Sequence, residues 1–208
     1  MCGVLGAVSN KIDKSLFDKS LESLSHRGPD DKNSKIINSL ETNFFLGHTR
    51  LSIIDLSING SQPMSSDDDD FIITFNGEIY NHTELRLMLE QNGHTFNGNS
   101  DTEVLLKSWI EWGQESLNKF VGMFAFCIFD KKKQMFFLAR DQFGIKPLYY
   151  LSNKKGFFFA SEIKSLKFFD NLQPNDRVSR EFLINGSHDA SEETFFENIY
   201  KVQPGEVL

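Results

Sequence analysis

The feature that most constrains this fold is a set of short apolar runs that are continuous instead of alternating with polar residues. They span residues 71–75, 123–129, 135–139 and 157–160. A strand with one face in water alternates apolar and polar residues, so these runs indicate strands buried on both faces. The 21 phenylalanines of the chain supply enough large apolar side chains for a core of single-domain size.

Three segments between these runs have the spacing of amphipathic helices, at residues 14–25, 82–91 and 102–112. Asn81 with Glu84, and Ser100 with Glu103, have the spacing of a helix capping box. Helices clustered between groups of doubly buried strands predict stacked sheets sandwiched between helix layers. Because the chain has neither internal repeats nor a linker rich in Gly, Ser or Pro, we expect one domain.

Composition argues against several classes of partner and location. The 208 residues carry a formal net charge of −7 without a block of Lys and Arg, which argues against nucleic acid, because that affinity rests on neutralising phosphates. No stretch approaches the roughly 18 consecutive apolar residues of a membrane span, and the N-terminus lacks the basic and apolar regions of an export signal. Cys2 and Cys127 do not form a disulfide framework, which fits a reducing compartment. We therefore expect a cytoplasmic protein that binds neither membrane nor nucleic acid.

Metal and nucleotide sites are not indicated in this chain. It has no GxxxxGK phosphate loop, no HExxH pair and no zinc-type CxxC pair, so the sequence predicts no cofactor and no metal. The four adjacent aspartates at residues 67–70 lack the spaced ligands and the glycine of a calcium loop and are typical of a solvated loop.

Chemistry is first indicated at Cys2. If the initiator Met1 is removed, as expected before a small second residue, the thiol and a free α-amine belong to one residue. That amine, with a pKa of about 7.7–8.0 in model peptides, can serve as the base for a thiol with a pKa of about 8.5. Taken alone, Cys2 is better explained as a small residue at the start of a buried strand. The motifs that follow reverse this interpretation.

These motifs are MCGVLGA, SHRGPDD (25–31), GHTRLSIIDLS (47–57), FNGEIYN (75–81), NSDTEVLL (99–106), FVGMFAFCIFD (120–130), ARDQFGIKPLYY (139–150) and FASEIKSL (159–166). In this order they resemble the N-terminal-nucleophile glutaminase domain of class II amidotransferases, and RGPD, RLSIID and NGEIYN are similar to its asparagine synthetase branch. The resemblance covers nearly the whole chain and implies a glutaminase domain over residues 2–208. It also implies the family fold, an α+β four-layer αββα sandwich.

The resemblance implies an enzyme that hydrolyses glutamine to glutamate and ammonia through a thioester on Cys2. Amide hydrolysis needs hydrogen-bond donors fixed where the tetrahedral oxyanion develops. In the family, the side chain and the backbone N–H of an Asn-Gly pair have this role, which implies Asn76 and Gly77 here. Without the other motifs, an Asn-Gly pair is better explained as a hairpin turn, and the two interpretations are compatible.

Glutamine also carries a carboxylate and an ammonium, so a selective pocket needs a countercharge for each. Arg50 matches the family's carboxylate-binding arginine, whose planar guanidinium suits a carboxylate; the alternative is a surface ion pair. Asp101 matches the residue that binds the ammonium, although an acid in the first turn of a helix is also favoured by the helix dipole. By the same matching, the substrate site also includes Leu51, Ile53, Ile54 and Glu78.

The remaining motif residues are assigned structural roles. Gly and Pro set turns in RGPD and in RDQFGIKPLYY, and Arg27, Asp30, Arg140 and Asp141 are candidates for partly buried ion pairs. Cys127, among phenylalanines within a strand, is expected to be an inert core thiol. A specific catalytic case is lacking for each of the five histidines, His26, His48, His82, His94 and His188.

The sequence ends at VQPGEVL, which resembles the close of the glutaminase domain. The family's ATP-binding synthetase half, with its Ser-Gly-Gly phosphate loop, is absent, so ATP and magnesium are expected only for that half. We expect the chain to supply ammonia to a synthetase domain, in the same longer polypeptide or as a separate subunit, that makes asparagine from aspartate. A homodimer and two alternative functions stay open: the glutaminase domain of an amidotransferase acting on another carboxylate, such as a sugar acid, and a non-catalytic glutamine-binding module.

Overall fold

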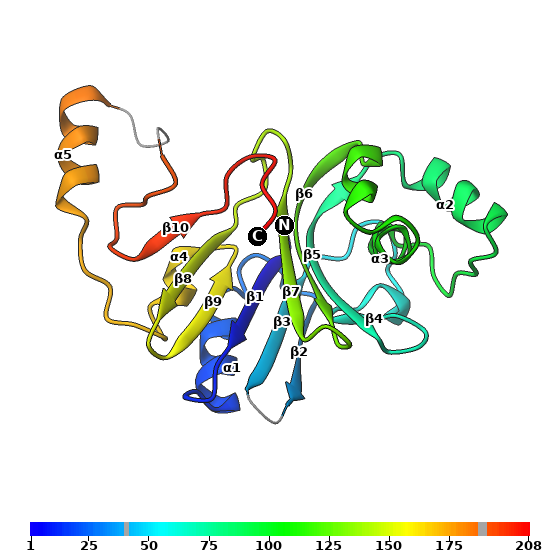
Figure 1. Cartoon of the computed structure of the whole chain (residues 1–208), viewed down its shortest axis with the longest axis horizontal. Coiled ribbons are helices and arrows are strands. Elements are labelled where there is room, and N and C mark those ends of the chain that lie inside the picture. The colour runs from blue at the N-terminus through cyan, green and yellow to red at the C-terminus, as the bar shows by residue number, and fades with distance from the viewer. Residues whose placement is uncertain (40–41, 187–190) are drawn as a thin grey trace.

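Two antiparallel sheets stack face to face in the computed structural model, which describes residues 1–39, 42–186 and 191–208 (Figure 1). The six-stranded sheet has the order β10-β8-β9-β1-β3-β2, and the four-stranded sheet has the order β4-β5-β6-β7. The strands are β1 (Gly3–Val8), β2 (Asp31–Asn38), β3 (Asn43–Arg50), β4 (Met64–Ser65), β5 (Phe71–Ile79), β6 (Gly122–Asp130), β7 (Met135–Arg140), β8 (Tyr149–Asn153), β9 (Gly156–Ala160) and β10 (Ile199–Lys201). His188 lies outside the described residues.

Helices cover the outer face of each sheet. Helices α1 (Lys14–Glu22) and α4 (Ile163–Leu166) pack on the six-stranded sheet, and α2 (His82–Gln91) and α3 (Asp101–Trp112) lie on the side of the four-stranded sheet (Figure 1). Helix α5 (Asp176–Asn185) lies at the far side of the six-stranded sheet, and η1 (Ile58–Gly60) and η2 (Gly113–Lys119) are short 3-10 helices.

Three apolar clusters fill the three spaces between these four layers. Phe17 of α1 packs with Phe45 of β3 in the first, and Phe44 packs with Phe129 of β6 between the sheets. Trp109 of α3 packs on Phe126 of β6 in the third. The predicted four-layer αββα sandwich is therefore confirmed.

All four continuous apolar runs lie in strands, and each strand is longer than its run. Strand β5 extends furthest, from residue 71 to residue 79, because polar residues continue it beyond the apolar segment. The predicted helix at residues 14–25 ends earlier, at Glu22, and the other two predicted helices agree with α2 and α3 to within one residue.

Only one of the two predicted helix caps forms. Ser100 Oγ accepts the N–H of Glu103 at the start of α3, as its spacing predicts. Asn81 precedes α2 but does not cap it, because its side chain accepts the N–H of Val121 and donates to the carbonyl of Lys119. Asn81 thus joins α2 to the segment that leads into β6.

The layer between the sheets changes from apolar to polar along its length. Alternate residues of a strand share a face, so Phe44, Leu46, His48 and Arg50 of β3 lie on one side of it. The first two of these belong to the inter-sheet core, and the last two are buried polar residues. The same change occurs from Val4 to Cys2 at the start of β1, and from Ile72 to Thr74 and Asn76 on β5.

Candidate active site

A cavity of about 250 Å³ lies at this polar end of the inter-sheet layer. This volume suits a small molecule, since sites for drug-sized ligands measure roughly 300–1,000 Å³. A larger hollow of about 480 Å³, lined by Asp67, His94 and Lys107 among others, contains neither cysteine. Every residue to which the sequence assigns a catalytic or substrate-binding role lines the smaller cavity: Cys2, Arg50, Leu51, Ile53, Ile54, Asn76, Gly77, Glu78 and Asp101.

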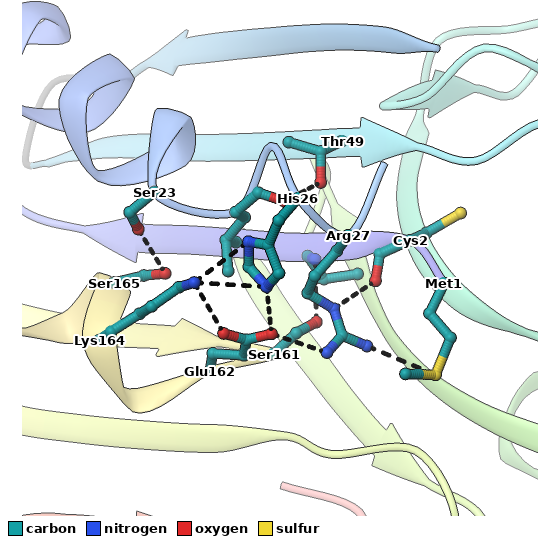
Figure 2. Close-up of polar contacts among 12 residues, drawn as sticks. Met1, Cys2, Ser23, His26, Arg27, Thr49, Ser161, Glu162, Lys164 and Ser165 are labelled. Carbon is teal, nitrogen blue, oxygen red and sulfur yellow. Dashed lines mark hydrogen bonds and ion pairs between the residues drawn. The ribbon is translucent and has the colours of Figure 1, made fainter. Parts of the chain in front are cut away.

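Cys2 directly precedes β1, which lies between β3 and β9 in the six-stranded sheet. Its carbonyl accepts a hydrogen bond of 2.8 Å from Arg27 Nε, and Figure 2 shows its sulfur directed away from this contact. On the sulfur side, the N–H of Leu51 donates to Cys2 Sγ at 3.4 Å. The backbone of Cys2 is therefore fixed from one side while the thiol lines the cavity on the other.

Arg27 is itself held by an ion pair with Glu162, whose Oε1 lies 2.9 Å from Arg27 Nη1 (Figure 2). His26 and Lys164 contact the same carboxylate at 2.8 and 3.2 Å. Burial alone would raise the pKa of Glu162, but hydrogen bonds from Arg27, His26 and Lys164 lower that pKa to about 2. Glu162 therefore stays ionised at neutral pH and keeps Arg27 in place against the Cys2 backbone.

The two thiols differ in their access to the cavity. Burial raises the pKa of the Cys2 thiol, while the Leu51 N–H, the charged N-terminus and Arg50 oppose that rise. Cys127 is fully buried between the sheets, and its burial raises the pKa of that thiol well above the ordinary value. Cys127 therefore has the properties of an inert core thiol, and Cys2 is the thiol that lines the cavity.

The free edge of β5 presents one backbone N–H to the cavity. In an antiparallel strand, alternate residues direct their backbone groups to opposite sides, and the odd residues of β5 direct theirs away from β6. Gln62 Oε1 accepts the N–H of Phe75 at 2.6 Å, and Asp101 Oδ2 accepts the N–H of Ile79 at 3.0 Å. Gly77 lies midway between them, and no hydrogen bond of its N–H to a side chain occurs within the described residues.

The Asn76-Gly77 pair lies inside β5, opposite Ala125 and Phe124 of β6, so it is not a hairpin turn. Asn76 is 1% exposed, and its Nδ2 has no hydrogen-bond partner among the described residues. A Cβ at Gly77 would lie 2.3 Å from the carbonyl oxygen of Met123, so only glycine allows this approach to β6. The pair thus offers two adjacent donors to the cavity, the amide of Asn76 and the N–H of Gly77.

His48 joins the two sheets at this point, a contact that sequence reasoning missed. Its Nε2 lies 3.0 Å from the carbonyl oxygen of Phe75, so Nε2 carries the proton and donates. Together, His48 and Gln62 bind both backbone groups of Phe75 where β4 has ended, and they fix the strand just before Asn76. His48 lies within the GHTRLSIIDLS motif, which assigns it no role, and Gln62 lies in none of the motifs, so the topology alone reveals this contact.

Arg50 and Asp101 bring opposite charges to the cavity. Arg50 is 8% exposed, and its guanidinium donates to the carbonyls of Ser57, at 2.9 Å, and Asp55, so it is not the surface ion pair considered as an alternative. A Cβ at Gly60 would lie 2.2 Å from Arg50 Nη2, so a side chain at this position would displace the guanidinium. Asp101 is 6% exposed and begins α3, and burial raises the pKa of its carboxyl.

The burial of His48 predicts a dependence of stability on pH. His48 is 1% exposed, and its burial lowers its pKa to about 4 from 6.5. The unfolded chain therefore binds a proton at a higher pH than the folded chain, so stability is lost as pH falls from 6.5 toward 4. The unfolding free energy from chemical denaturation should therefore be lower at pH 5 than at pH 7 by about 2 kcal/mol on account of His48.

The matched variant is His48→Gln, whose side-chain amide can still donate to Phe75 but does not titrate. The difference in unfolding free energy between wild type and this variant should change by that amount between the two pH values. Parallel pH profiles for the two proteins would show that His48 is not a buried neutral histidine.

The sequence matches the family described as glutamine amidotransferase domain over residues 1–208. The chain belongs to this family. The glutamine amidotransferase domain is 40% identical over 212 residues to asparagine synthetase [glutamine-hydrolyzing] 1 of Bacillus subtilis. The match covers 99% of the chain and 33% of that protein. It is 36% identical over 192 residues to amidase chry2 of Gibberella zeae, covering 92% of the chain and 28% of that protein. The domain thus spans about a third, or less, of each relative.

Among solved structures, the glutamine amidotransferase domain resembles glutamine phosphoribosylpyrophosphate amidotransferase from B. subtilis, with a TM-score of 0.68. The match covers 80% of this chain and 43% of that chain at 23% identity, so the likeness concerns the fold. Within the described residues, no helix is both long and apolar enough to span a membrane. The same residues contain no group of three or more His, Cys, Asp and Glu that could hold a metal ion.

Proposed function

We propose that this glutamine amidotransferase domain, over residues 2–208, hydrolyses glutamine to glutamate and ammonia in the cytoplasm. The observation that carries the proposal is the convergence of three kinds of group on one cavity: a thiol, two hydrogen-bond donors without a partner among the described residues, and two buried opposite charges. Cys2 provides the first, Asn76 and Gly77 the second, and Arg50 and Asp101 the third. A thiol, donors for an oxyanion and a countercharge for each end of an amino acid are the groups that amide hydrolysis of glutamine requires.

In the proposed reaction, removal of Met1 frees the α-amine of Cys2. This amine takes the proton of the thiol, and the sulfur attacks the carboxamide carbon of glutamine. The carbonyl oxygen becomes an oxyanion that accepts hydrogen bonds from Asn76 Nδ2 and Gly77 N–H. The ammonium returns the proton to the leaving nitrogen, ammonia departs, and a γ-glutamyl thioester remains. Water, activated by the same amine, then hydrolyses the thioester to glutamate and regenerates the thiol.

The substrate is held by its α-amino acid group. The Arg50 guanidinium, which keeps donors beyond those bound to Ser57 and Asp55, would bind the α-carboxylate. Asp101, with Glu78 nearby in the cavity wall, would bind the α-ammonium. Leu51, Ile53 and Ile54 would line the rest of the site. A cavity with both countercharges favours an amino acid over a simple amide.

The ammonia would serve a synthetase domain in the same longer polypeptide or in a separate subunit. Similarity to an asparagine synthetase supports aspartate as the acceptor of ammonia, with ATP and magnesium bound by that other domain. A different carboxylate, such as a sugar acid, is the alternative, because the residues that would select the acceptor lie outside the glutaminase site. We assign no cofactor to the glutaminase steps, since thiol, amine, side-chain amide and backbone N–H carry each of them.

The substrate analogue 6-diazo-5-oxo-norleucine tests this proposal, because it has the same amino acid group as glutamine. With Met1 removed, the chain should hydrolyse glutamine, and the analogue should alkylate Cys2 and leave Cys127 unmodified, as peptide mapping by mass spectrometry will show. The isolated chain should form no asparagine from ATP, aspartate and glutamine. Absence of both labelling and glutamine turnover would favour a non-catalytic glutamine-binding module.

A further inference from the structure

Lys146 lines the Cys2 cavity from the loop between β7 and β8. Both of its backbone groups are bound by charged side chains of the preceding residues. Asp141 Oδ2 accepts the Lys146 N–H at 3.0 Å, and Arg140 Nε donates to the Lys146 carbonyl at 2.7 Å. The position of Lys146 is therefore determined at the backbone on both sides.

Arg140 and Asp141 also form hydrogen bonds with other backbone groups in and around this loop. Arg140 also donates to the carbonyls of Gly144 and Val202, at 2.6 and 2.7 Å. The Asp141 carboxylate also accepts backbone N–H groups, from Phe124, Phe143 and Ile145. The sequence suggests ion pairs for Arg140 and Asp141, but the structure shows a binding scaffold for backbone groups. This scaffold holds in place a loop whose one cavity-lining residue is Lys146.

The side chain of Lys146 differs from those of Arg50 and Arg27, the other cationic side chains near Cys2. Lys146 is only 6% exposed, yet within the described residues no hydrogen bond or ion pair of its ammonium is found. Arg50 donates to two carbonyls, and Arg27 donates to the Cys2 carbonyl and to Glu162. Lys146 thus brings to the cavity wall a positive charge that pairs with no described side chain, which points to a function that needs the charge.

The charged groups around the cavity show what that charge can act on. Lys146 interacts electrostatically with the Cys2 thiol, Glu78, Asp141 and Arg27. Asp141 is occupied by the four backbone N–H groups of the loop scaffold and β6, and Asp101 across the cavity accepts the N–H of Ile79. The Cys2 thiol is the one of these groups that becomes anionic during the proposed reaction.

We propose that Lys146 is a cation that, together with the N-terminus and Arg50, stabilises the thiolate form of Cys2. The inference rests on the proposed function, in which Cys2 is the nucleophile, and it assigns an electrostatic role to a loop that the sequence marks only as a turn. A nearby ammonium or guanidinium is a common means by which proteins favour a thiolate.

The electrostatics agree with this geometry. Burial raises the pKa of the Cys2 thiol, so a compensating positive charge is needed for ionisation near neutral pH. Burial lowers the pKa of Lys146, and Arg27 acts in the same direction, whereas Cys2, Glu78 and Asp141 raise it. The interaction between Cys2 and Lys146 thus favours the charged form of both.

The test is the pH profile of Cys2 alkylation by iodoacetamide, between pH 6 and pH 10, because the thiolate is the form that reacts. It uses the full chain with Met1 removed, and peptide mapping assigns the label to Cys2. Lys146→Met keeps a similar shape without the charge, and its alkylation midpoint should rise by about one pH unit, which slows labelling at neutral pH about tenfold. Lys146→Arg should restore the wild-type profile.

A control variant and a replacement variant ensure that the experiment can contradict the inference. Lys132→Met, at an exposed lysine in the β6–β7 turn, is the matched control and should leave the profile unchanged. If Lys146→Met does not fold, as judged by circular dichroism, Lys146→Gln replaces it. An unchanged alkylation profile in either folded variant overturns the inference, even if thermal stability falls. The assay contains no glutamine, so a wild-type chain that fails to hydrolyse glutamine but shows the shift would count against the proposed function alone.

Discussion

Protein that retains Met1 should hydrolyse glutamine about 10²–10⁴-fold more slowly than protein that begins at Cys2. The reason is that the Met1 peptide bond converts the α-amine of Cys2 into an amide nitrogen, which cannot accept a proton. A positioned general base contributes roughly that factor to catalysis. Intact-mass spectrometry identifies the two forms, and steady-state ammonia release compares them.

Two controls separate the loss of the base from other effects of the extra residue. Cys2→Ala, in processed protein, sets the rate without a nucleophile. Met1-retaining protein should still react with iodoacetamide at high pH, since its sulfur remains in the cavity. Equal rates of glutamine hydrolysis by the two mass-verified wild-type forms would exclude the α-amine as the base.

Truncation of the cavity's charges should weaken substrate binding, whereas truncation of the amide donor should slow turnover. Arg50→Ala and Asp101→Ala should each raise KM by an amount equivalent to about 2–5 kcal/mol, because each leaves a charge of bound glutamine without its countercharge. Asn76→Ala should instead lower kcat by about 2.7–4 kcal/mol, since its amide is needed for the oxyanion. Steady-state kinetics of the three variants measure both parameters.

Arg50 requires a control, because its guanidinium also binds the carbonyls of Ser57 and Asp55. Ser57→Ala keeps the backbone carbonyl and removes only the hydroxyl that precedes η1, so it should leave KM unchanged. Unchanged KM values in both charge variants would remove Arg50 and Asp101 from the substrate site. A KM effect without a kcat effect in Asn76→Ala would remove Asn76 from the oxyanion site.

The layers of the fold could be predicted from the continuous apolar runs, because a strand that is buried on both faces has apolar residues at consecutive positions. The extent of β5 could not be predicted, since Asn76 and Gly77 have the composition of a turn and continue the strand only because β6 pairs with them. The Asn81 cap failed for a similar reason, since a loop 40 residues away competes for its side chain.

The candidate site could be assembled from motifs, but not its supporting contacts. Nine residues with assigned roles share one cavity, as the resemblance implies. Two of these contacts are made by Gln62 and His48, which bind the backbone of Phe75. Lys146 acts through its charge on Cys2. Their residue types alone do not indicate which distant neighbour each one contacts. Lys146 stands out only in the structure, where Arg140 and Asp141 bind the backbone groups on both sides of it.

Because the inter-sheet layer changes from aromatic to polar residues along its length, the packing of its core also sets the geometry of the cavity. Cys2 precedes a strand of one sheet and the Asn76-Gly77 donors belong to the other, so the thickness of the packing around Phe44 and Phe129 sets how far apart they lie. A substitution that changes the volume of a side chain in that packing should therefore change this distance without touching the cavity. Core residues remote from the cavity would therefore influence turnover through the spacing of the two sheets.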